Sequence, residues 1–252
     1  MNSSLLTPLT SQFEHRDALI AQVRQLCSST ETTVSNRFIG GRAPAEAKLE
    51  RINPIAYAST RNHADGAVTQ LSPYIRHGIM SDEQVYAHLS RHFDLNQCEK
   101  LLQQLSWRAF FHYTHRQAPQ LIWTSREAYK TGFNEVDYAN ELPEDIRYGQ
   151  TGIKLIDQLI AALLNDGYLH NHYRLYLASY VVHWRRVQWQ AGARWLLTHL
   201  LDGAIASHNY SWQGMASSFS SKPYIFNFDN IKQFTDHYPD TDDASNGCFD
   251  SS

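Results

Sequence analysis

A long amphipathic pattern between Thr151 and Gly167 constrains the fold more than any other feature of the chain. Apolar residues recur there at helical spacing, at positions 153, 156, 159, 160, 163 and 164, and Gly167 stands where a helix of this length would end. A second pattern begins near Asn171, with an apolar face of Tyr173, Leu177, Tyr180, Trp184 and Val187, and a shorter one ends around Leu201. These patterns predict three helices in succession.

Further helix starts are visible upstream. One helix is expected after Gly40 and Gly41, with Pro44 in its first turn. Capping signals mark three others, at Ser72 with Pro73, Ser81 with Gln84, and Asn96 with Glu99. Residues 118–149 have turn residues and weak periodicity, which predicts a partly irregular connection. No alternating strand pattern and no glycine-rich strand-to-helix fingerprint is present, so the predicted fold is all-α.

Three segments are predicted from composition and periodicity. Residues 1–38 form an N-terminal arm with one amphipathic piece, residues 39–234 form the helical domain, and residues 235–252 form an acidic, disordered tail. The chain carries 22 basic and 25 acidic residues, but five Asp residues lie beyond position 235, so the rest carries 22 − 20 = +2. This charge does not exclude anionic partners.

The cellular setting is predicted from what the sequence lacks. The N-terminus has no basic start followed by an apolar run, and no apolar stretch of about 18 residues occurs, so we expect a cytoplasmic protein without a membrane contact. Cys27, Cys98 and Cys248 have no close spacing and are expected to be free thiols. Aromatic residues make up 12% of the chain and either pack a core or stack on planar ligands, or do both.

Several motifs occur together in the second half. They are Thr151-Gly152, Tyr168-Leu169-His170-Asn171 with Arg174, Trp189, Asp202-Gly203-Ala204 and Trp212-Gln213. In this order they resemble the flavin-binding domain of the DNA photolyase and cryptochrome family. Tyr57 with Arg61-Asn62, the sequence VTQLSPYIRHG and WRAF at 107–110 resemble further motifs of that family, so the resemblance covers roughly Gly40 to Phe234.

The resemblance implies a helical FAD-binding domain of photolyase and cryptochrome type, without the N-terminal α/β domain and its antenna chromophore. FAD is the expected cofactor. The expected cofactor-binding residues are Tyr57, Val68, Thr69, Gln70, Leu71, Ser72, Arg108, Asn171, Arg174, Asp202, Gly203, Ala204, His208 and Asn209. Residues 68–72 precede a predicted helix start, whose free N–H groups and hydroxyls can hold a pyrophosphate, although an ordinary helix cap gives the same pattern. Arg174 and Asp202 match the family's ion pair beside the flavin ring, or form a surface salt bridge.

Four residues are expected to take part in catalysis. Trp189 and Trp212 match the middle and inner members of the family's tryptophan chain, although both can be core aromatics. The outer member aligns near Val136, which leaves Tyr138, Tyr148 or Trp184 as substitutes and predicts altered photoreduction. Gln104 stands where dimer-repairing members have a Glu, and an amide cannot deliver a proton. His208 stands where they have an Asn facing the flavin N5 atom, and its titration near neutral pH would give or take the N5 proton.

Nucleic acid is the expected partner. The expected contact residues are Arg61, Gln104, Trp107, Arg108, Phe111, His172 and Leu175. Trp107 matches the tryptophan that stacks on the flipped dimer. A stripe of Arg108, His112, His115 and Arg116 fits phosphates or forms a solvated face. Two departures from the family pattern concern the pocket: Ala204 removes a contact to the flavin, and Gly214 replaces a tryptophan and widens the pocket. No metal site is expected at His170 and His172, because side chains two residues apart on a helix diverge.

These features predict a light-dependent flavoprotein that binds single-stranded or damaged DNA, or RNA, and splits pyrimidine dimers by electron transfer from reduced FAD. The enzyme class would be deoxyribodipyrimidine photolyase, a carbon–carbon lyase. The alternative is a non-catalytic, cryptochrome-like flavin photoreceptor or nucleic-acid-binding protein, which Gln104, Ala204 and His208 favour. A helical scaffold that has lost the flavin is a third reading.

Overall fold

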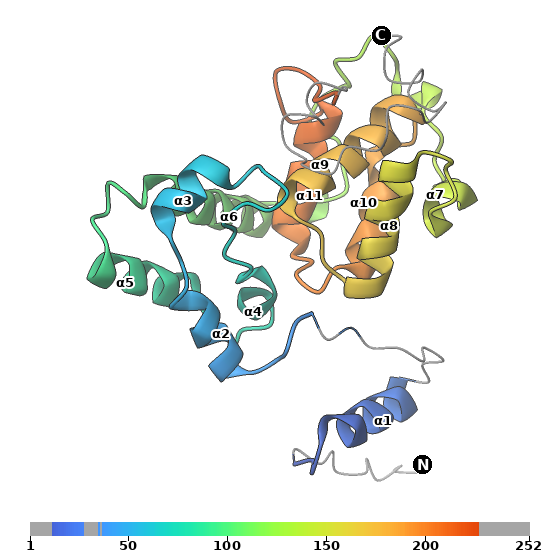
Figure 1. Cartoon of the computed structure of the whole chain (residues 1–252). Coiled ribbons are helices and arrows are strands. Elements are labelled where there is room, and N and C mark those ends of the chain that lie inside the picture. Colours follow the sequence, from blue (N-terminus) through green and yellow to red (C-terminus); the bar gives the residue numbers. More distant parts are fainter. Residues whose placement is uncertain (1–11, 28–34, 36, 227–252) are drawn as a thin grey trace, which may run out of the picture. The chain divides into compact units, whose positions relative to one another are not determined.

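The computed structural model describes residues 12–27, 35 and 37–226. Contacts divide the chain into two units, Met1–Asn36 and Arg37–Ser252. The first unit contains α1 (Arg16–Cys27), where the sequence predicts an amphipathic piece. The helices of the second unit are α2 (Arg42–Leu49), α3 (Pro54–Thr60), α4 (Ser72–Arg76), α5 (Asp82–His92), α6 (Glu99–Gln117), η1 (Pro119–Leu121), η2 (Glu135–Asp137), α7 (Glu144–Tyr148), α8 (Lys154–Asp166), α9 (Asn171–Ser179), η3 (Tyr180–Trp184), α10 (Trp189–His199) and α11 (Ile205–Ala216) (Figure 1). The predicted tail, residues 235–252, lies outside the described residues, and the predicted domain boundaries stay predictions.

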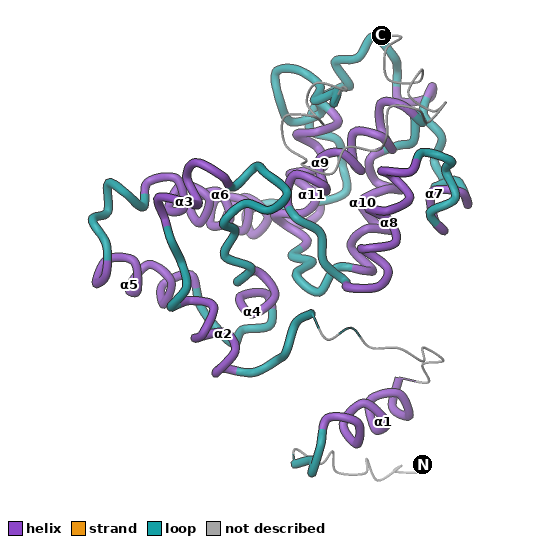
Figure 2. The backbone as a smooth tube through the Cα atoms, in the orientation of Figure 1, coloured by secondary structure: helices purple, strands orange, loops and turns teal. Residues whose placement is uncertain are grey.

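The described residues form helices joined by loops (Figure 2). Extended pairing within them amounts to one bridge between Ala139 and Val187, and no strand is present there. The all-α prediction is therefore confirmed. In this part of the chain, no helix has the length and apolar character needed to cross a bilayer. The cytoplasmic location stays a prediction.

Two local signals are confirmed. Ser81 forms both bonds of a capping box, because its hydroxyl accepts from the Gln84 N–H at 3.2 Å and its own N–H donates to the Gln84 side chain at 2.8 Å. Helix α8 ends at Gly167, which has a φ of 64° in the left-handed region, where glycine has no Cβ to clash. Its buried face holds Leu155, Ile156, Leu159, Ile160 and Leu163.

Three other expectations about helices are wrong. Asn96 does not cap α6, which begins at Glu99 after Cys98, because the Asn96 N–H is bound by the Asp94 carboxylate in the preceding turn. Ser72 is the first residue of α4 rather than its cap, and its hydroxyl makes a long-range bond instead. The helix expected from Asn171 to Val187 stops at Ser179 and continues as the π-helical turn η3.

Two core clusters lie in the second unit. One gathers buried residues from α7 to α11, including Ile160, Tyr176 and Trp189, and the other gathers buried residues from α2 to α6, including Leu71 and Leu101. Figure 1 shows α8, α9, α10 and α11 grouped together, and α6 extending from the other helices to α11. Helix α6 therefore contacts helices of both clusters, α3 in one and α11 in the other.

Candidate functional site

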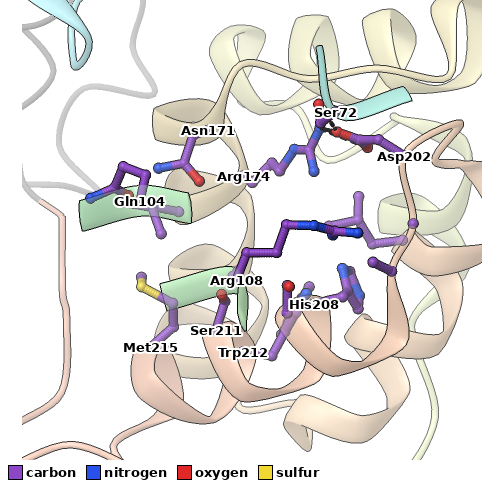
Figure 3. Close-up of a pocket in the computed structure, with 16 residues that line it drawn as sticks. Ser72, Gln104, Arg108, Asn171, Arg174, Asp202, His208, Ser211, Trp212 and Met215 are labelled. Atoms are coloured by element: carbon purple, nitrogen blue, oxygen red, sulfur yellow. Dashed lines mark hydrogen bonds and ion pairs between the residues drawn. The ribbon is translucent and has the colours of Figure 1, made fainter. Parts of the chain in front are cut away.

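A cavity of about 290 Å³ lies between the two core clusters (Figure 3). Its walls come from α4, α6, α9, α10, α11 and the loop before α11. The lining residues are Ser72, Gln104, Arg108, Asn171, Arg174, Leu175, Ala178, Leu196, Asp202, Gly203, Ala204, Ser207, His208, Ser211, Trp212 and Met215. Its volume is near the lower end of the range for small-molecule sites. Most of the expected cofactor-binding residues of α9 and α11 therefore meet here.

A second cavity of about 140 Å³ adjoins the first, since Ser72, Gln104 and Arg108 line both. Tyr57, Thr69 and Leu71 also line it, so these three expected cofactor residues join the same region. A larger ligand can therefore extend from one cavity into the other.

Arg174 and Asp202 form an ion pair in the cavity wall. One guanidinium nitrogen of Arg174 donates to both carboxylate oxygens of Asp202, at 2.9 and 2.8 Å, and the Ser72 hydroxyl donates to the same carboxylate at 2.6 Å. The Asp202 side chain is 3% exposed, so the surface salt bridge is the wrong reading of this pair. Arg174 also donates from Nε to the Leu169 carbonyl at 2.9 Å, which fixes the orientation of its guanidinium.

His208 is a buried neutral side chain in the same wall. Its Nε2 lies 2.9 Å from the Ala193 carbonyl, and because a carbonyl only accepts, Nε2 carries the proton. Burial lowers the pKa of His208 to about 4, with the Arg174 charge acting in the same direction. The expected titration of His208 near neutral pH is therefore wrong, and at that pH the Nδ1 atom is an acceptor only.

Two tryptophans extend from the cavity wall into the core. Trp212 is 3% exposed and lines the cavity, with its ring 6.1 Å from that of His208. A Cβ built on Gly192 of α10 would come within 2.6 Å of the Trp212 ring, so the ring packs directly on the helix backbone. Trp189, the first residue of α10, is fully buried and belongs to the same core cluster. Both residues pack the core, and Trp212 also faces the site.

The structure shows one aromatic neighbour that sequence reasoning missed. The Trp123 ring stacks on Trp189 with centroids 6.1 Å apart and an angle of 10° between the planes. Trp123 lies in the irregular segment 118–149, which carries no periodicity that would place it. The expected substitutes have other surroundings, since Tyr138 stacks on Tyr129 and Tyr148 is 61% exposed.

The side chains of residues 68–72 do not all line the same cavity. Val68 and Gln70 line a separate cavity of about 380 Å³ with His170 and Tyr168. Gln70 has a φ of 52°, in the left-handed region, and consecutive N–H groups in such a turn can form an anion-binding concavity. The predicted helix N-terminus is weak support for a pyrophosphate, because α4 has only five residues.

Asn209 is not placed as expected. Its side-chain amide donates to the Ile122 carbonyl at 3.0 Å and the residue is fully buried, which directs it into the core rather than toward the cavity. Sequence spacing along α11 could not show this, because Ile122 is 87 residues away along the chain.

The residues present fit FAD. Two guanidinium groups and two amides, from Arg108, Arg174, Gln104 and Asn171, offer donors for phosphate and heteroaromatic atoms, and apolar side chains fill the remaining wall. The Ser207 hydroxyl lines the cavity, is buried and has no hydrogen-bond partner in the protein. A buried polar group without a partner is costly, so this hydroxyl indicates a ligand that bonds to it.

The expected nucleic-acid residues are only partly at the surface. On α6, Trp107, Phe110 and Tyr113 are 49%, 46% and 56% exposed and form an aromatic face. Phe111 turns inward and stacks on Tyr210 at 5.6 Å, while Gln104 and Leu175 line the cavity. Arg61 lies over the Tyr57 ring at 5.8 Å.

Two expectations about basic groups are wrong. His172 is 7% exposed and packs edge-on against Tyr176, so it offers no surface to a nucleic acid. The basic stripe of α6 is not a solvent-facing row, because Arg108 pairs with Asp82 at 3.2 Å and burial lowers the pKa of His112. Of its four members Arg116 alone is exposed, and the other three are half-buried. Among the described residues, no group of three or more His, Cys, Asp or Glu could hold a metal ion.

Comparison with known families gives a match over α6 to α11, which supply all of the cavity lining except Ser72. The model for the FAD binding domain of DNA photolyase matches residues 101–243. The deoxyribodipyrimidine photo-lyase of Alkalihalophilus pseudofirmus is 30% identical over 170 residues, which cover 66% of this chain and 35% of that protein. The enzyme of the same name from Escherichia coli K12 is 26% identical and covers 83% of this chain and 41% of its own length. The chain thus spans less than half of these relatives.

Solved structures share the fold. An archaeal photolyase from Sulfolobus tokodaii with two FAD molecules has a TM-score of 0.68 at 25% identity, over 81% of this chain and 46% of its own. A cryptochrome from Synechocystis has a TM-score of 0.67 at 23% identity, over 79% of this chain and 44% of its own. The second likeness is evidence for the fold alone.

Proposed function

Because the chain belongs to the family of FAD-binding domains of DNA photolyases, we propose that it is a light-dependent flavoprotein that splits pyrimidine dimers. Its cofactor is FAD. The substrate we propose is damaged or single-stranded nucleic acid, with DNA preferred and RNA as a second candidate.

The observation that carries this proposal is the arrangement of three residues on α6. Gln104 and Arg108 line the cavity, and Trp107, one turn from Gln104, is 49% exposed. An exposed indole stacks on a base without regard to sequence, and enzymes that act on a base take it out of the stack. A base held on Trp107 would lie beside the side chains that enter the cavity. The partner chemistry that fits is therefore a splayed base rather than an intact duplex.

When bound and reduced, FAD supplies under blue light the electron that opens the dimer. The protein's own groups position the reactants. Arg174, held by Asp202 and Leu169, presents a fixed positive charge at the wall, where it can orient an electron-rich ring. Gln104 can donate to or accept from the base edge but cannot deliver a proton. His208 stays neutral and offers an acceptor at Nδ1.

A second function is favoured by the acid groups of the site. Asp202 is the sole carboxylate among the described residues that line the cavity, and it is bound to Arg174 and Ser72. No lining carboxyl group is therefore free to protonate a base. This favours the alternative of a cryptochrome-like flavin photoreceptor or nucleic-acid binder that does not repair.

One experiment separates the two functions. The purified protein is loaded with FAD, reduced and illuminated with an oligothymidine that contains dimers, and dimer loss is followed by chromatography. Dimer loss in wild type that falls in Trp107→Ala supports repair, with Tyr86→Ala as the control because Tyr86 is equally exposed, at 49%, on α5. Bound flavin and bound oligonucleotide without dimer loss would refute repair and support the alternative. Competition with duplex and RNA forms then ranks the strands.

A further inference from the structure

The outer face of α6 carries a row of four side chains that begins beside the cavity. The row consists of Trp107, Phe110, Tyr113 and Arg116, which follow one another at intervals of three residues. Gln104, three residues before Trp107, lies in the cavity wall (Figure 3). Residues three apart on a helix are neighbours on its surface, and each step advances about 4.5 Å along the axis. The row therefore leads from the cavity toward the C-terminal end of α6.

The three aromatic side chains of the row face solvent. Trp107, Phe110 and Tyr113 are 49%, 46% and 56% exposed. The Phe111 ring packs against the first two, at 5.7 and 5.8 Å, and stacks on the buried Tyr210 ring. Aromatic side chains that are already held in place lose little conformational entropy when they bind a planar group. The row is therefore a preformed surface for stacking.

The charge on α6 favours an anionic partner. From Lys100 to Gln117 the helix contains no Asp or Glu. Arg116, at the far end of the row, is exposed and forms no ion pair in the part of the chain that the structure describes. Aromatic rings beside a cation are the groups with which proteins bind single-stranded nucleic acid, because bases stack on the rings and phosphates lie near the cation. Bases in a duplex already stack on one another, so the partner that fits is a single strand.

We propose that the row binds the stretch of single-stranded nucleic acid that leaves the cavity, and this rests on the proposed function. The base that follows the one on Trp107 stacks on Phe110, and the next base stacks on Tyr113. Arg116 contacts a phosphate beyond them. The row thus holds about three nucleotides on one side of the cavity. The affinity for a strand therefore depends on its length on that side.

The test measures binding of undamaged oligothymidines to the FAD-loaded protein in the dark, by fluorescence anisotropy at fixed salt. Lengths from about two to about eight nucleotides first fill the row and then exceed it. The affinity should rise with length until the row is filled and then level off. Tyr113→Ala should weaken binding of the longer strands by about fivefold to a hundredfold. It should weaken binding of the dinucleotide much less, because two bases on Trp107 and Phe110 do not reach residue 113.

Three further variants separate stacking and charge from a structural effect. Tyr113→Phe keeps the ring and should retain the wild-type affinity. Tyr148→Ala is the matched control, because Tyr148 is similarly exposed, at 61%, on α7, and its affinities should equal those of wild type. Arg116→Gln removes one phosphate contact and should lower the slope of log affinity against log salt by about 0.7.

The outcomes distinguish this proposal from the proposed function. Affinities in Tyr113→Ala that equal those of wild type at every length would overturn the role of the row. A Phe110→Ala variant that turns a dimer into a monomer in analytical ultracentrifugation, with unchanged oligonucleotide affinity, would assign the row to a second copy of the chain instead. Wild-type protein that splits a dinucleotide dimer but shows no rise of affinity with length would refute the row and leave the proposed function standing. A rise with length without dimer splitting under blue light would refute repair alone.

Discussion

Gly192 is the position where one added methyl group should test the site most directly. It lies in α10, and a Cβ there would meet two Trp212 ring atoms at 2.6 and 2.7 Å and a Val181 methyl at 2.8 Å. Both neighbours are buried, Trp212 at 3% and Val181 at 0% exposure, so neither can move into solvent. In Gly192→Ala we expect the Trp212 ring to shift toward the cavity, since that is the open space beside it.

The magnitude follows from two opposing effects. An alanine inside a helix is usually favoured over glycine by about 0.5–1 kcal/mol. Overpacking a buried site typically costs about 1–3 kcal/mol. Gly214 of α11 is the matched control, because a Cβ there meets nothing within 4 Å and only the helix preference remains. Gly192→Ala should therefore be roughly 1–3 kcal/mol less stable than Gly214→Ala.

The assay is thermal unfolding of both variants, with and without FAD. For a chain of this size each kcal/mol shifts the Tm by about 2–4 °C, so the difference is measurable. Flavin absorbance after gel filtration should fall in Gly192→Ala and persist in Gly214→Ala. Equal stability and equal flavin content in the two variants would show that the Trp212 ring does not pack on Gly192 as described. The position of Trp212 in the cavity wall would then be wrong as well.

Three further predictions concern the charged and aromatic groups. Asp202→Asn leaves the Arg174 charge without its partner and should cost about 1.5–3 kcal/mol in chemical unfolding, with weaker FAD retention; unchanged values would contradict the pair's role. His208 binds its proton only near pH 4 when folded but near 6.5 when unfolded, so acidification from 6.5 to 4 should remove up to about 3 kcal/mol of stability. His208→Asn should lack this part of the pH dependence, and equal pH curves would refute it. Trp107→Ala should weaken oligothymidine binding by about 1–3 kcal/mol, measured by fluorescence anisotropy at fixed salt, and unaltered affinity would exclude stacking.

Local signals in the sequence were sufficient for the helices that carry their own caps. The capping box at Ser81 and the terminal Gly167 depend on residues within a few positions, so a single sequence shows them. Asn96 failed because its neighbour Asp94 offers a competing acceptor in the preceding turn. The π-helical turn η3 is equally invisible in the apolar pattern, which continues through it.

The sequence predicted the site residues that belong to a complete motif. It did not predict a side chain whose direction or charge depends on one contact with a residue far away in the sequence. Arg174 and Asp202 meet as the motif implied, across 28 residues. The direction of Asn209 depends on the Ile122 carbonyl, and the charge state of His208 depends on burial, which no spacing reveals. Trp123 was missed for the same reason, since its partner Trp189 is 66 positions away and its own segment has no periodicity.

The short helix α4 is joined to the segment before α11 by polar contacts. Three side chains from α4 and its C-terminal end contact this segment. Ser72 donates to Asp202, Arg76 donates to the Gly203 carbonyl at 2.6 Å, and His77 lies 2.9 Å from the Leu201 carbonyl. These polar contacts lie between two hydrophobic clusters. The ion pair of Arg174 with Asp202 is by itself weak evidence for stability, because burying two charges costs much of what their attraction returns. These directional bonds add to the packing of α6 on α11, where the Phe111 ring stacks on Tyr210. A ligand that binds only the folded state in this cavity adds stability that grows with the logarithm of the ligand concentration, so added FAD should raise the Tm.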